Sequence, residues 1–419
     1  MPPPAPEKNP WYLLATLHGT PDQQLSTWDP VRHKNRLAWN RWMAVAIDDV
    51  QREKLIATGR YSRPELTPLS EGEEIEWHKL FRARAGNQSG LEVPPPRREV
   101  SISEVDFGPD FELSGYVFPT HLHAKGTSFA AIAPFSDCDF LGISDFSKSQ
   151  FSGPAILMRN NQFHNRTEFR SAQFHGATSF LRTEFDVVGF QEVTFHDHVD
   201  FFFLVSNDNA DFSCATFKHV AIFNNAEFKC RLSFRKAQFV RPPLFLNSKL
   251  PEGLDLGEIA WPRLRTTTKD PQEFIEAYQR LKSEMDRQKL HEQEMMFFGC
   301  EMQARGSALG KKTFAGLAIA TYGALSDYGR SYVRPLGWLA SLITIGGLIG
   351  FAVAGRSLLE SLGLSFVDTF GVFGFRKDFI QAFSSPPRSL LVLEWIQTII
   401  GSALIFLFVL ALQKRFRMR

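Results

Sequence analysis

The dominant pattern in the chain is a phenylalanine at every fifth or sixth position between Phe129 and Phe245. The two step lengths mostly alternate, so the pattern repeats every eleven residues. An amphipathic helix needs an apolar residue every three to four positions, and a half-buried strand needs one at every second position. Neither spacing fits this stretch, which therefore predicts a fold built from repeated units.

One large apolar residue per five or six positions suits a coil with four sides, each of which points one phenylalanine inward. Four sides make about 22 residues per turn, with turns stacked about 4.8 Å apart, so we expect about five turns between Phe129 and Phe245. A small or β-branched residue two positions before many phenylalanines is expected to point inward as well. These residues are Ala172, Val193, Ala210, Ala215, Ala221, Ala226 and Ala237.

In two places the spacing of the phenylalanines departs from the eleven-residue period. Leu157 is expected to take the place of a phenylalanine between Phe151 and Phe163, and the coil is expected to be bulged or out of register there and around 185–195. The aromatic rings that we expect to stack inside the coil include Phe169, Phe174, Phe180, Phe185, Phe212, Phe217, Phe223, Phe228, Phe234 and Phe239.

The repeat resembles a known family. The runs AQFHGATSF (172–180), ADFSCATF (210–217) and AEFKCRLSFRKAQF (226–239) are similar to the phenylalanine-centred variant of the pentapeptide-repeat family. The resemblance implies an all-β, right-handed quadrilateral β-helix, which we place at residues 99–250. Residues 99–128 have irregular spacing, and we expect them to form an imperfect first coil that caps the open end.

Residues 1–98 have a different composition and predict a helical segment that ends in a linker at 85–98. Trp39, Trp42, Met43, Ala46 and Val50 follow helical spacing, so we expect a helix near 35–55. Two interpretations stay open for this tryptophan-rich segment, which also contains Trp28 and Trp77. It is a small helical cap with tryptophans in its core, or a partner-binding module with exposed aromatic anchors.

After the repeat, residues 270–305 predict a connecting amphipathic helix, with Asp270-Pro271 as its start. Phe274, Tyr278, Leu281 and Met285 follow at four-three-four spacing, as in a coiled coil. This apolar stripe packs on the end of the β-helix, or it mediates self-association into an oligomer.

Residues 310–419 predict a membrane module with two helical spans. Residues 335–355 are 21 residues without a charge, which at 1.5 Å per residue cover about 31 Å, enough for the hydrocarbon core. Residues 390–413 form the second span. Residues 313–328 are apolar but too short to span, so we expect them to lie in the membrane interface.

The charges that flank the spans predict their orientation. Eight basic residues lie outside the hairpin, namely Lys311, Lys312, Arg330, Arg334, Lys414, Arg415, Arg417 and Arg419, and four lie in its loop, namely Arg356, Arg376, Lys377 and Arg388. By the positive-inside rule both chain ends are cytoplasmic. The loop 357–387 is rich in phenylalanine and is expected to dip back into the bilayer or to pack against a partner's spans.

The tail carries a second resemblance. The segments ALSDYGRSYVRPLGW (324–338) and ALQKRFRMR (411–419) around the spans resemble the two-span C-terminal module of some bacterial pentapeptide-repeat membrane proteins. That module is similar in layout to two-span ion-channel pore units, although no segment here is similar to a TVGYG-type potassium filter. The resemblance implies a multi-pass protein of the bacterial inner membrane.

Four residues in the spans are candidate functional residues. Glu394 and Gln397 are polar residues inside the second span, where an ionisable side chain is a candidate for function. The alternative for Glu394 is that it reaches the outer headgroups beside Trp395. Gly346 and Gly350 form a GxxxG pattern that permits close helix packing, or they are ordinary membrane glycines.

Charge and motifs narrow the function. The net charge is +2, and residues 129–245 hold eleven basic and twelve acidic residues, which argues against nucleic acid or DNA mimicry. No catalytic or nucleotide motif is present, and the pairs His121/His123 and His196/His198 lack a third metal ligand, so we expect no enzyme, cofactor or metal. Four cysteines without a CxxC spacing indicate a reduced compartment.

These observations lead to two hypotheses. The first is a membrane-anchored protein-interaction scaffold or sensor, with the lipid bilayer and an unidentified cytoplasmic protein as partners and a homo-oligomer as its state. The second is an oligomeric, channel-like pore that the cytoplasmic β-helix gates.

Overall fold

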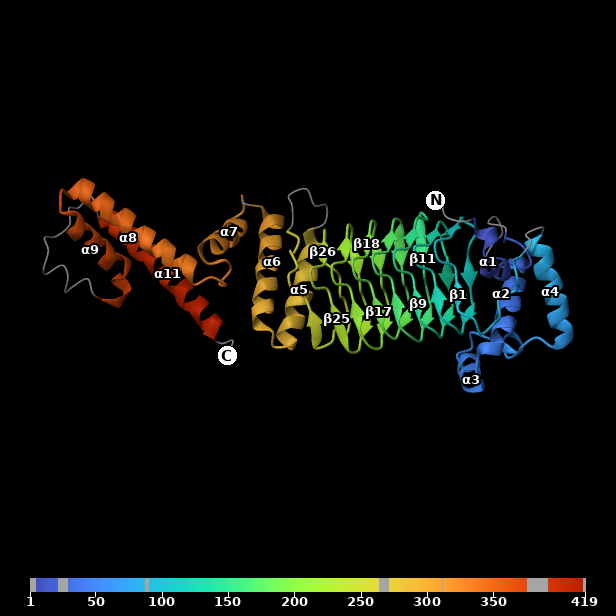
Figure 1. Cartoon of the computed structure of the whole chain (residues 1–419). Helices are drawn as coiled ribbons and strands as arrows, with labels where there is room; N and C mark the ends of the chain where they lie inside the picture. The colour runs from blue at the N-terminus through green and yellow to red at the C-terminus, as the bar shows by residue number, and fades with distance from the viewer. Residues whose placement is uncertain are drawn as a thin grey trace. The chain divides into compact units, whose positions relative to one another are not determined.

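A computed structural model describes residues 5–21, 29–86, 90–263, 271–310, 312–374 and 391–416. The chain divides into two compact units, Met1–Pro262 and Arg263–Arg419. The first unit holds four helices and a long stack of short strands (Figure 1), and the second is helical throughout its described part. Each unit is described by itself.

The strands of the first unit form a parallel β-solenoid of about seven turns. Its longest sheet contains β1 (Val100–Ser101), β5 (Leu122–His123), β9 (Ser144–Asp145), β13 (Thr167–Glu168), β17 (Val188–Gly189), β21 (Ala210–Asp211), β25 (Arg231–Ser233) and β27 (Gly253–Asp255). A second sheet contains β2 (Asp106–Phe107), β6 (Ser128–Phe129), β10 (Gln150–Phe151), β14 (Gln173–Phe174), β18 (Thr194–Phe195), β22 (Thr216–Phe217) and β26 (Gln238–Phe239).

The remaining strands form two further sheets and a pair. One sheet contains β4 (Val117–Phe118), β8 (Asp139–Phe140), β12 (Gln162–Phe163), β16 (Glu184–Phe185), β20 (Val205–Ser206) and β24 (Glu227–Phe228). The other contains β11 (Ala155–Leu157), β15 (Ala177–Ser179), β19 (Val199–Asp200) and β23 (Ala221–Ile222), and β3 (Leu113–Ser114) pairs with β7 (Phe135–Ser136). Most strands pair with the strand four places along the chain, so a turn has about four strands. The solenoid is confirmed; its right-handed sense and square cross-section stay predictions.

The register of the strands reproduces the predicted turn length and its irregularities. Phe129 pairs with Phe151 at 22 residues, Phe151 with Phe174 at 23, and Phe174 with Phe195 at 21. The turns of 23 and 21 residues lie where the spacing of the phenylalanines departs from the eleven-residue period, around Leu157 and around 185–195. The solenoid also extends past the predicted limit of residue 250, because β27 adds a strand at 253–255.

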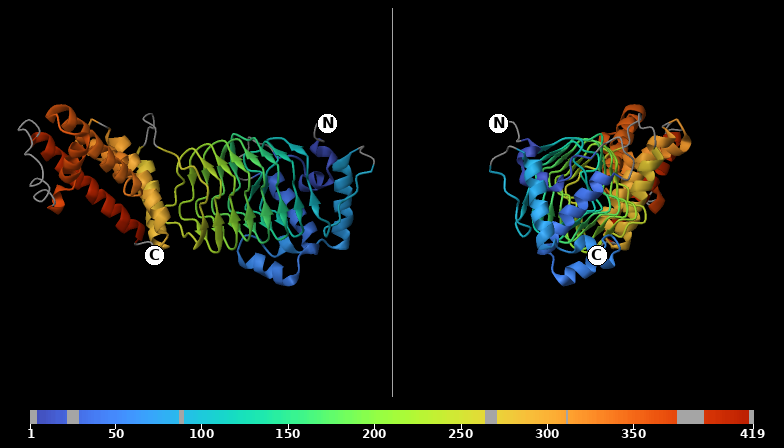
Figure 2. Two further views of the ribbon diagram at one scale, coloured as in Figure 1. Left: turned by 60° about the vertical axis from the view of Figure 1, so that its left-hand side comes forward. Right: turned by 90° about the vertical axis from the view of Figure 1, so that its right-hand side faces the viewer.

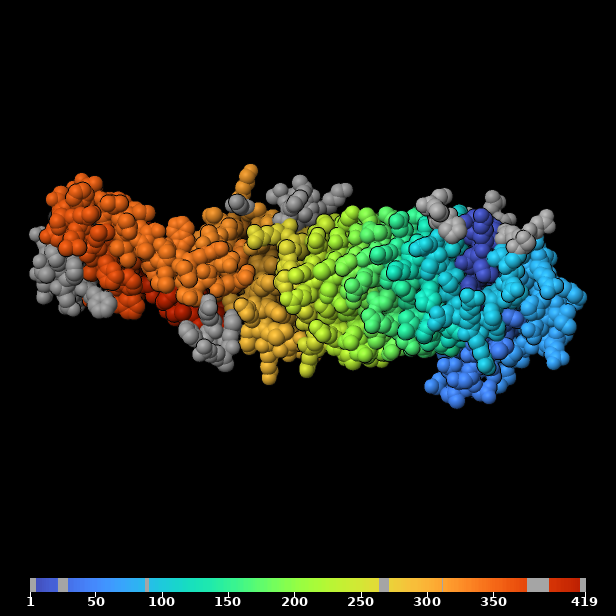
Figure 3. Space-filling view, in the orientation of Figure 1, coloured from blue at the N-terminus to red at the C-terminus, as the bar shows by residue number. Residues whose placement is uncertain are grey.

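The phenylalanine rings stack from turn to turn inside the solenoid. The Phe201 ring, for example, lies 5.2 Å from that of Phe180 in the turn before and 4.8 Å from that of Phe223 in the turn after, with interplanar angles of 6° and 8°. All ten phenylalanines expected to stack are buried, as are the seven small residues expected to point inward. Figures 2 and 3 show these turns as one continuous stack and one continuous surface.

Two places in the ring stack between Phe129 and Phe245 hold a residue other than phenylalanine, and the prediction for the first of them is wrong. Leu157 does not take the place of a phenylalanine, because it is only partly buried, whereas Ile156 and Met158 on either side are fully buried. Strand alternation turns Leu157 to the other face, and Met158 stands 22 residues before Phe180 in the stack. Ser206 occupies a second such place, since it pairs with Phe185 below and Phe228 above.

A left-handed corner recurs about every eleven residues and explains the period. The corner residues other than glycine have φ between 54° and 60° and are Glu104, Asp137, Lys148, Asn160, Ser171, Arg182, Glu192, Phe203, Cys214, Asn225, Lys236, Asn247 and Glu258. The residue after each of these corners is buried and usually small, except at Glu258, where the following Ile259 is only partly buried. Where that residue is polar it bonds to the turn below: Ser149 Oγ donates to Ala124 O at 2.6 Å, and Thr183 Oγ1 donates to Met158 O at 2.8 Å.

The first unit begins with four helices, α1 (Pro10–Ala15), α2 (Pro30–Met43), α3 (Asp49–Ala57) and α4 (Glu71–Ala85), and three short 3-10 turns, η1 (Pro6–Lys8), η2 (Ala44–Ala46) and η3 (Pro64–Leu66). The single helix predicted near 35–55 is wrong. The chain leaves helical geometry at Ile47, and Asp48 starts α3 through a reciprocal capping box with Gln51.

Helix α2 closes the open end of the solenoid. The Trp39 Nε1–H donates to Val117 O at 2.8 Å, and the Asn40 side chain accepts from Val117 N and donates to Gly115 O, both at 2.9 Å. These bonds satisfy backbone groups at the edge strand β4 that would otherwise be unpaired. Residues 99–128 form the first coil of the solenoid, as expected, but α2 covers this coil, so the expectation that the coil itself is the cap is wrong.

The tryptophans of this segment lie in its core. Trp39, Trp42 and Trp77 are at most 6% exposed, and the rings of Trp42 and Trp77 stack at 4.4 Å. The interpretation of these three as exposed anchors for a partner is therefore wrong, and the helical cap is the correct alternative. Trp28 lies outside the described residues.

The second unit contains α5 (Pro271–Arg287), α6 (His291–Leu309), α7 (Phe314–Ser326), α8 (Val333–Ala354), α9 (Leu358–Thr369), η4 (Gly371–Phe373) and α11 (Leu391–Phe416). The one helix expected over 270–305 is two, because the chain turns at Lys289, whose φ is +58°. The predicted stripe on α5 is buried, and within this unit Tyr278 lies 6.3 Å from Phe297 of α6. The expected start at Asp270 lies outside the described residues.

Two helices of the second unit are long and apolar enough to cross a membrane. They are Val333–Ala354 and Val392–Lys414, close to the predicted spans at 335–355 and 390–413. The predicted loop 357–387 begins with helix α9, and its part from 375 onward lies outside the described residues.

We predict that removing one ring from the stack destabilises the solenoid far more than removing a ring outside it. Phe201→Ala should lower the free energy of unfolding by about 3–5 kcal/mol, because it leaves a cavity between two stacked rings. Phe203→Ala, at a side chain that is 44% exposed, should change it by less than about 1 kcal/mol. Urea unfolding of the detergent-solubilised chain, followed by circular dichroism, measures both; equal midpoints for the two variants would contradict the stacked core.

Candidate functional site

The candidate residues of the spans meet where α8, α9 and α11 pack together. Helix α9 contacts both α8 and α11. It begins at a capping box in which Ser357 accepts from Glu360 N and the Glu360 side chain accepts from Ser357 N. Its polar residues Ser361, Ser365 and Thr369 follow at four-residue spacing and are buried. This spacing places them on one face of the helix, which faces the two candidate spans.

Gln397 is the centre of a buried hydrogen-bond network. Its side-chain amide is within 2.8 Å of Ser365 O, 2.6 Å of Ser365 Oγ and 2.8 Å of Thr369 Oγ1. Ser365 Oγ in turn donates to Ile343 O of α8 at 2.7 Å. One glutamine side chain therefore links α11 to α9, and one serine links α9 to α8.

Glu394 lies one turn before Gln397 and is also buried, at 8% exposure, whereas its neighbour Trp395 is 67% exposed. The Glu394 side chain lines a small pocket of about 30 Å³ together with Asp368, Arg356 and Gln397. A volume of this size corresponds to about one water molecule. The position that we considered as a headgroup-facing carboxylate thus points into the helix junction, beside a second carboxylate and a guanidinium.

The two glycines of the GxxxG pattern lie on the face of α8 that meets this junction. A Cβ at Gly346 would stand 2.5 Å from Gln397 Oε1 and 2.6 Å from Ser365 Oγ, so the network requires the absence of a side chain. A Cβ at Gly350 would meet Ser361 Cβ at 3.5 Å, an ordinary contact. The close helix contact at these glycines is made within the same chain, with α9 at both glycines and also with Gln397 of α11 at Gly346.

The residues of α9 escaped the sequence analysis. The segment that contains Ser365, Asp368 and Thr369 was interpreted as a phenylalanine-rich loop, so no helix was predicted there. The signal that would have found them was present, since Ser357 and Glu360 form a capping box just before an amphipathic pattern.

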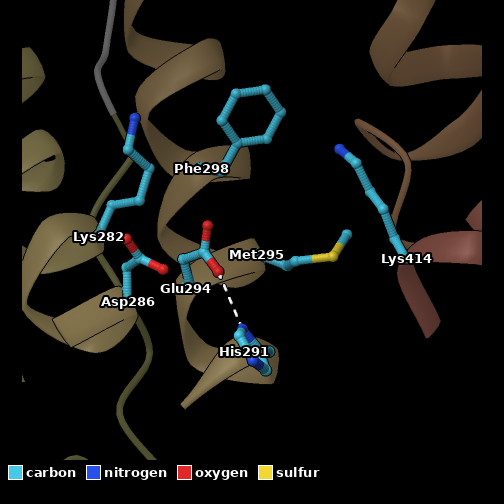
Figure 4. Close-up of a pocket in the computed structure, with 7 residues that line it drawn as sticks. All are labelled: Lys282, Asp286, His291, Glu294, Met295, Phe298 and Lys414. Atoms are coloured by element: carbon cyan, nitrogen blue, oxygen red, sulfur yellow. Dashed lines mark hydrogen bonds and ion pairs between the residues drawn. The ribbon is translucent and has the colours of Figure 1, made fainter. Parts of the chain in front are cut away.

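A second concave site lies in the same unit, at the turn between α5 and α6 (Figure 4). The cavity has a volume of about 680 Å³ and is lined by Lys282, Asp286, His291, Glu294, Met295, Phe298 and Lys414. Lys282 and Lys414 lie over the Phe298 ring, with their Nζ atoms 5.7 Å and 5.1 Å from its centroid. The sequence did not reveal this site, because a single helix over 270–305 has no turn to bring Asp286 beside Glu294.

The thiol groups with perturbed pKa values have structural surroundings. Burial raises the pKa of Cys138 in the solenoid to about 12 and that of Cys300 in α6 to about 11. Both thiols are therefore held in the unreactive protonated form at neutral pH, and neither is activated as a nucleophile.

No protein-family model, curated protein or solved structure matches this chain. The interpretation of the fold therefore rests on the repeat and on the geometry described above.

We predict that Gly346→Ala destabilises the helix junction and that Gly350→Ala does not. The methyl group at residue 346 overlaps Gln397 and Ser365, and overpacking of this kind costs about 1–3 kcal/mol. At residue 350 the methyl group has room, and alanine is the better helix former by about 1 kcal/mol. Thermal unfolding in detergent measures both variants, and an unchanged midpoint for Gly346→Ala would contradict the described packing.

Proposed function

We propose that this chain is a membrane-anchored member of the pentapeptide-repeat family whose solenoid is a scaffold or sensor for a protein partner. In this proposal α8 and α11 cross the bacterial inner membrane, and both chain ends lie in the cytoplasm. The solenoid and its helical cap then work on the cytoplasmic side.

The outward apolar surface of the two candidate spans is the observation that carries the proposal. On α8 the side chains of Ile345, Leu348 and Phe351 are 49–57% exposed, and on α11 those of Trp395 and Ile399 are 67% exposed. A core helix of a soluble protein buries such residues, whereas only 11% of the most apolar part of α8 is buried. An apolar surface of this extent needs lipid or a partner around it.

Helix α7 fits the same placement. It has 13 residues, too few to cross the hydrocarbon core, and its Phe314 and Leu317 are 88% and 55% exposed. A short apolar helix with outward side chains suits the membrane interface. The basic residues that precede the first span and follow the second outnumber those in the loop between them, which favours the orientation with cytoplasmic ends.

The scaffold role rests on the exterior of the solenoid. Its interior is filled with stacked rings, so we assign the recognition of a partner to the outer faces of the turns. Those faces carry acidic and basic side chains. Polar residues also stack from turn to turn, as the rings of His175 and His196 do at 4.6 Å. A regular, rigid polar surface suits recognition of another protein.

A second candidate, a channel-like pore, is favoured by the buried polar junction. Glu394, Asp368, Arg356 and Gln397 meet between apolar helices, and ionisable residues within a membrane often mark an ion pathway. Two spans do not enclose a pathway alone, so this candidate requires several copies of the chain around one axis.

Membrane insertion is tested by the fraction of full-length protein that stays with cell membranes after alkaline carbonate washing and is released by detergent. Wild type should remain in the membrane. Leu348→Arg should reduce the inserted fraction, because arginine at the centre of a span costs about 2.5–3.5 kcal/mol. Val50→Arg places the same charge on α3, at a side chain that is 66% exposed, and should leave the fraction unchanged.

A chain that stays in the supernatant without detergent would overturn the proposal. The same purified protein, placed in planar bilayers, separates the two candidates. The scaffold predicts no conductance, whereas a conductance that is lost in Glu394→Gln supports the pore.

A further inference from the structure

We infer that the turn between α5 and α6 is a binding site for a divalent transition-metal ion with Asp286, His291 and Glu294 as its ligands. The carboxylate and imidazole atoms that these three offer all lie within 4.8 Å of one another. This inference does not depend on the proposed function, since all three ligands belong to the helical hairpin. It revises the expectation of no metal, which rested on the two histidine pairs of the solenoid.

The chain geometry explains how three residues so close in sequence converge. Asp286 stands in the last turn of α5, and His291 is the first residue of α6. The left-handed residue Lys289 reverses the chain between them. Glu294 lies three residues after His291, on the same face of α6, and Figure 4 shows its carboxylate beside that of Asp286.

The distances suit a metal of the zinc type. Imidazole nitrogen and carboxylate oxygen bind zinc at about 2.0–2.2 Å, which places tetrahedral neighbours roughly 3.3–3.6 Å apart. His291 Nδ1 and Glu294 Oε2 are 3.4 Å apart. The remaining separations of up to 4.8 Å close by side-chain rotation at exposed or half-exposed positions.

The ligand set selects the class of ion. One imidazole with two carboxylates suits zinc, manganese and iron(II), whereas magnesium and calcium prefer an all-oxygen shell. Three protein ligands leave at least one coordination position, and the same three residues line the cavity of about 680 Å³, which has room for a further ligand. The site is thus open to an additional ligand, unlike a closed structural zinc site.

Local charge also favours a cation here. The Asp286 and Glu294 carboxylates repel each other at this distance. The two lysines that line the cavity are engaged elsewhere, because Lys282 Nζ is 2.6 Å from Glu301 Oε2 and Lys414 lies over the Phe298 ring. Among the described residues, no ion pair reaches the Asp286 carboxylate. A divalent ion supplies the missing positive charge and cross-links the end of α5 to the start of α6.

The test measures Zn²⁺ binding to the full-length, chelator-treated protein in detergent by isothermal titration and by metal analysis after dialysis. Exposed Cys214 and Cys230 are replaced by serine in every sample to remove competing thiols. We expect one ion per chain. We expect Asp286→Asn, His291→Ala and Glu294→Gln each to weaken binding at least tenfold, since each removes a ligand.

His123→Ala is the matched control. It removes a histidine that lies 2.9 Å from the carboxylate of Glu99 on the solenoid, and it should leave zinc affinity unchanged. Cobalt(II) provides a spectroscopic readout of the same site. Its visible absorption should appear with wild type and not with the triple variant Asp286→Asn/His291→Ala/Glu294→Gln, and circular dichroism checks that this variant is folded. Zinc binding of unchanged stoichiometry and affinity in the triple variant would overturn the inference.

Discussion

Stacking of phenylalanine rings from one turn to the next is the interaction on which the first unit depends. The rings of Phe151 and Phe174 lie 4.5 Å apart and within 1° of parallel, although their turn is one residue longer than the turn before it and two residues longer than the turn after it. Each buried ring contributes about 1.5–3 kcal/mol. Each left-handed corner at a residue other than glycine costs about 1–2 kcal/mol. A turn has two such corners and about four inward positions, so burial outweighs the strain that the corners impose.

A stack of this kind must be closed at its ends, because the last turn exposes both aromatic surface and unpaired backbone groups. Trp39 serves both needs at the first end, since its ring lies 5.3 Å from Phe118 and its N–H bonds to the edge strand. The same rule of satisfying buried polar groups governs the second unit, where Gln397 and Ser365 join three apolar helices. In both units a few polar side chains fix the arrangement of surfaces that burial alone would leave interchangeable.

Much of this architecture follows from the spacing of apolar residues that are close in sequence. The rest depends on contacts between residues that are far apart in sequence. The eleven-residue repeat of phenylalanines predicts the solenoid, and a 21-residue uncharged stretch predicts α8. Leu157 was misplaced because an extra residue in its turn shifts the strand alternation, which a count of phenylalanines does not detect. The break at Asp48 and the start of α9 at Ser357 were missed although both carry a capping box. The cluster at Gln397 requires α8, α9 and α11 to meet, and the cluster at His291 requires α5 to turn back onto α6. No single segment shows either arrangement.

The most direct test of the central claim is the distance between spin labels placed one above another along the solenoid. Exposed Glu104, Glu192 and Glu258 share the same left-handed corner in different turns. Electron–electron double resonance of the pairs Glu104→Cys/Glu192→Cys and Glu104→Cys/Glu258→Cys, with the native cysteines replaced, measures the rise per turn. Stacked turns predict separations of about 19 Å over four turns and about 34 Å over seven, from about 4.8 Å per turn. Distances that do not grow in proportion to the number of turns would contradict the account.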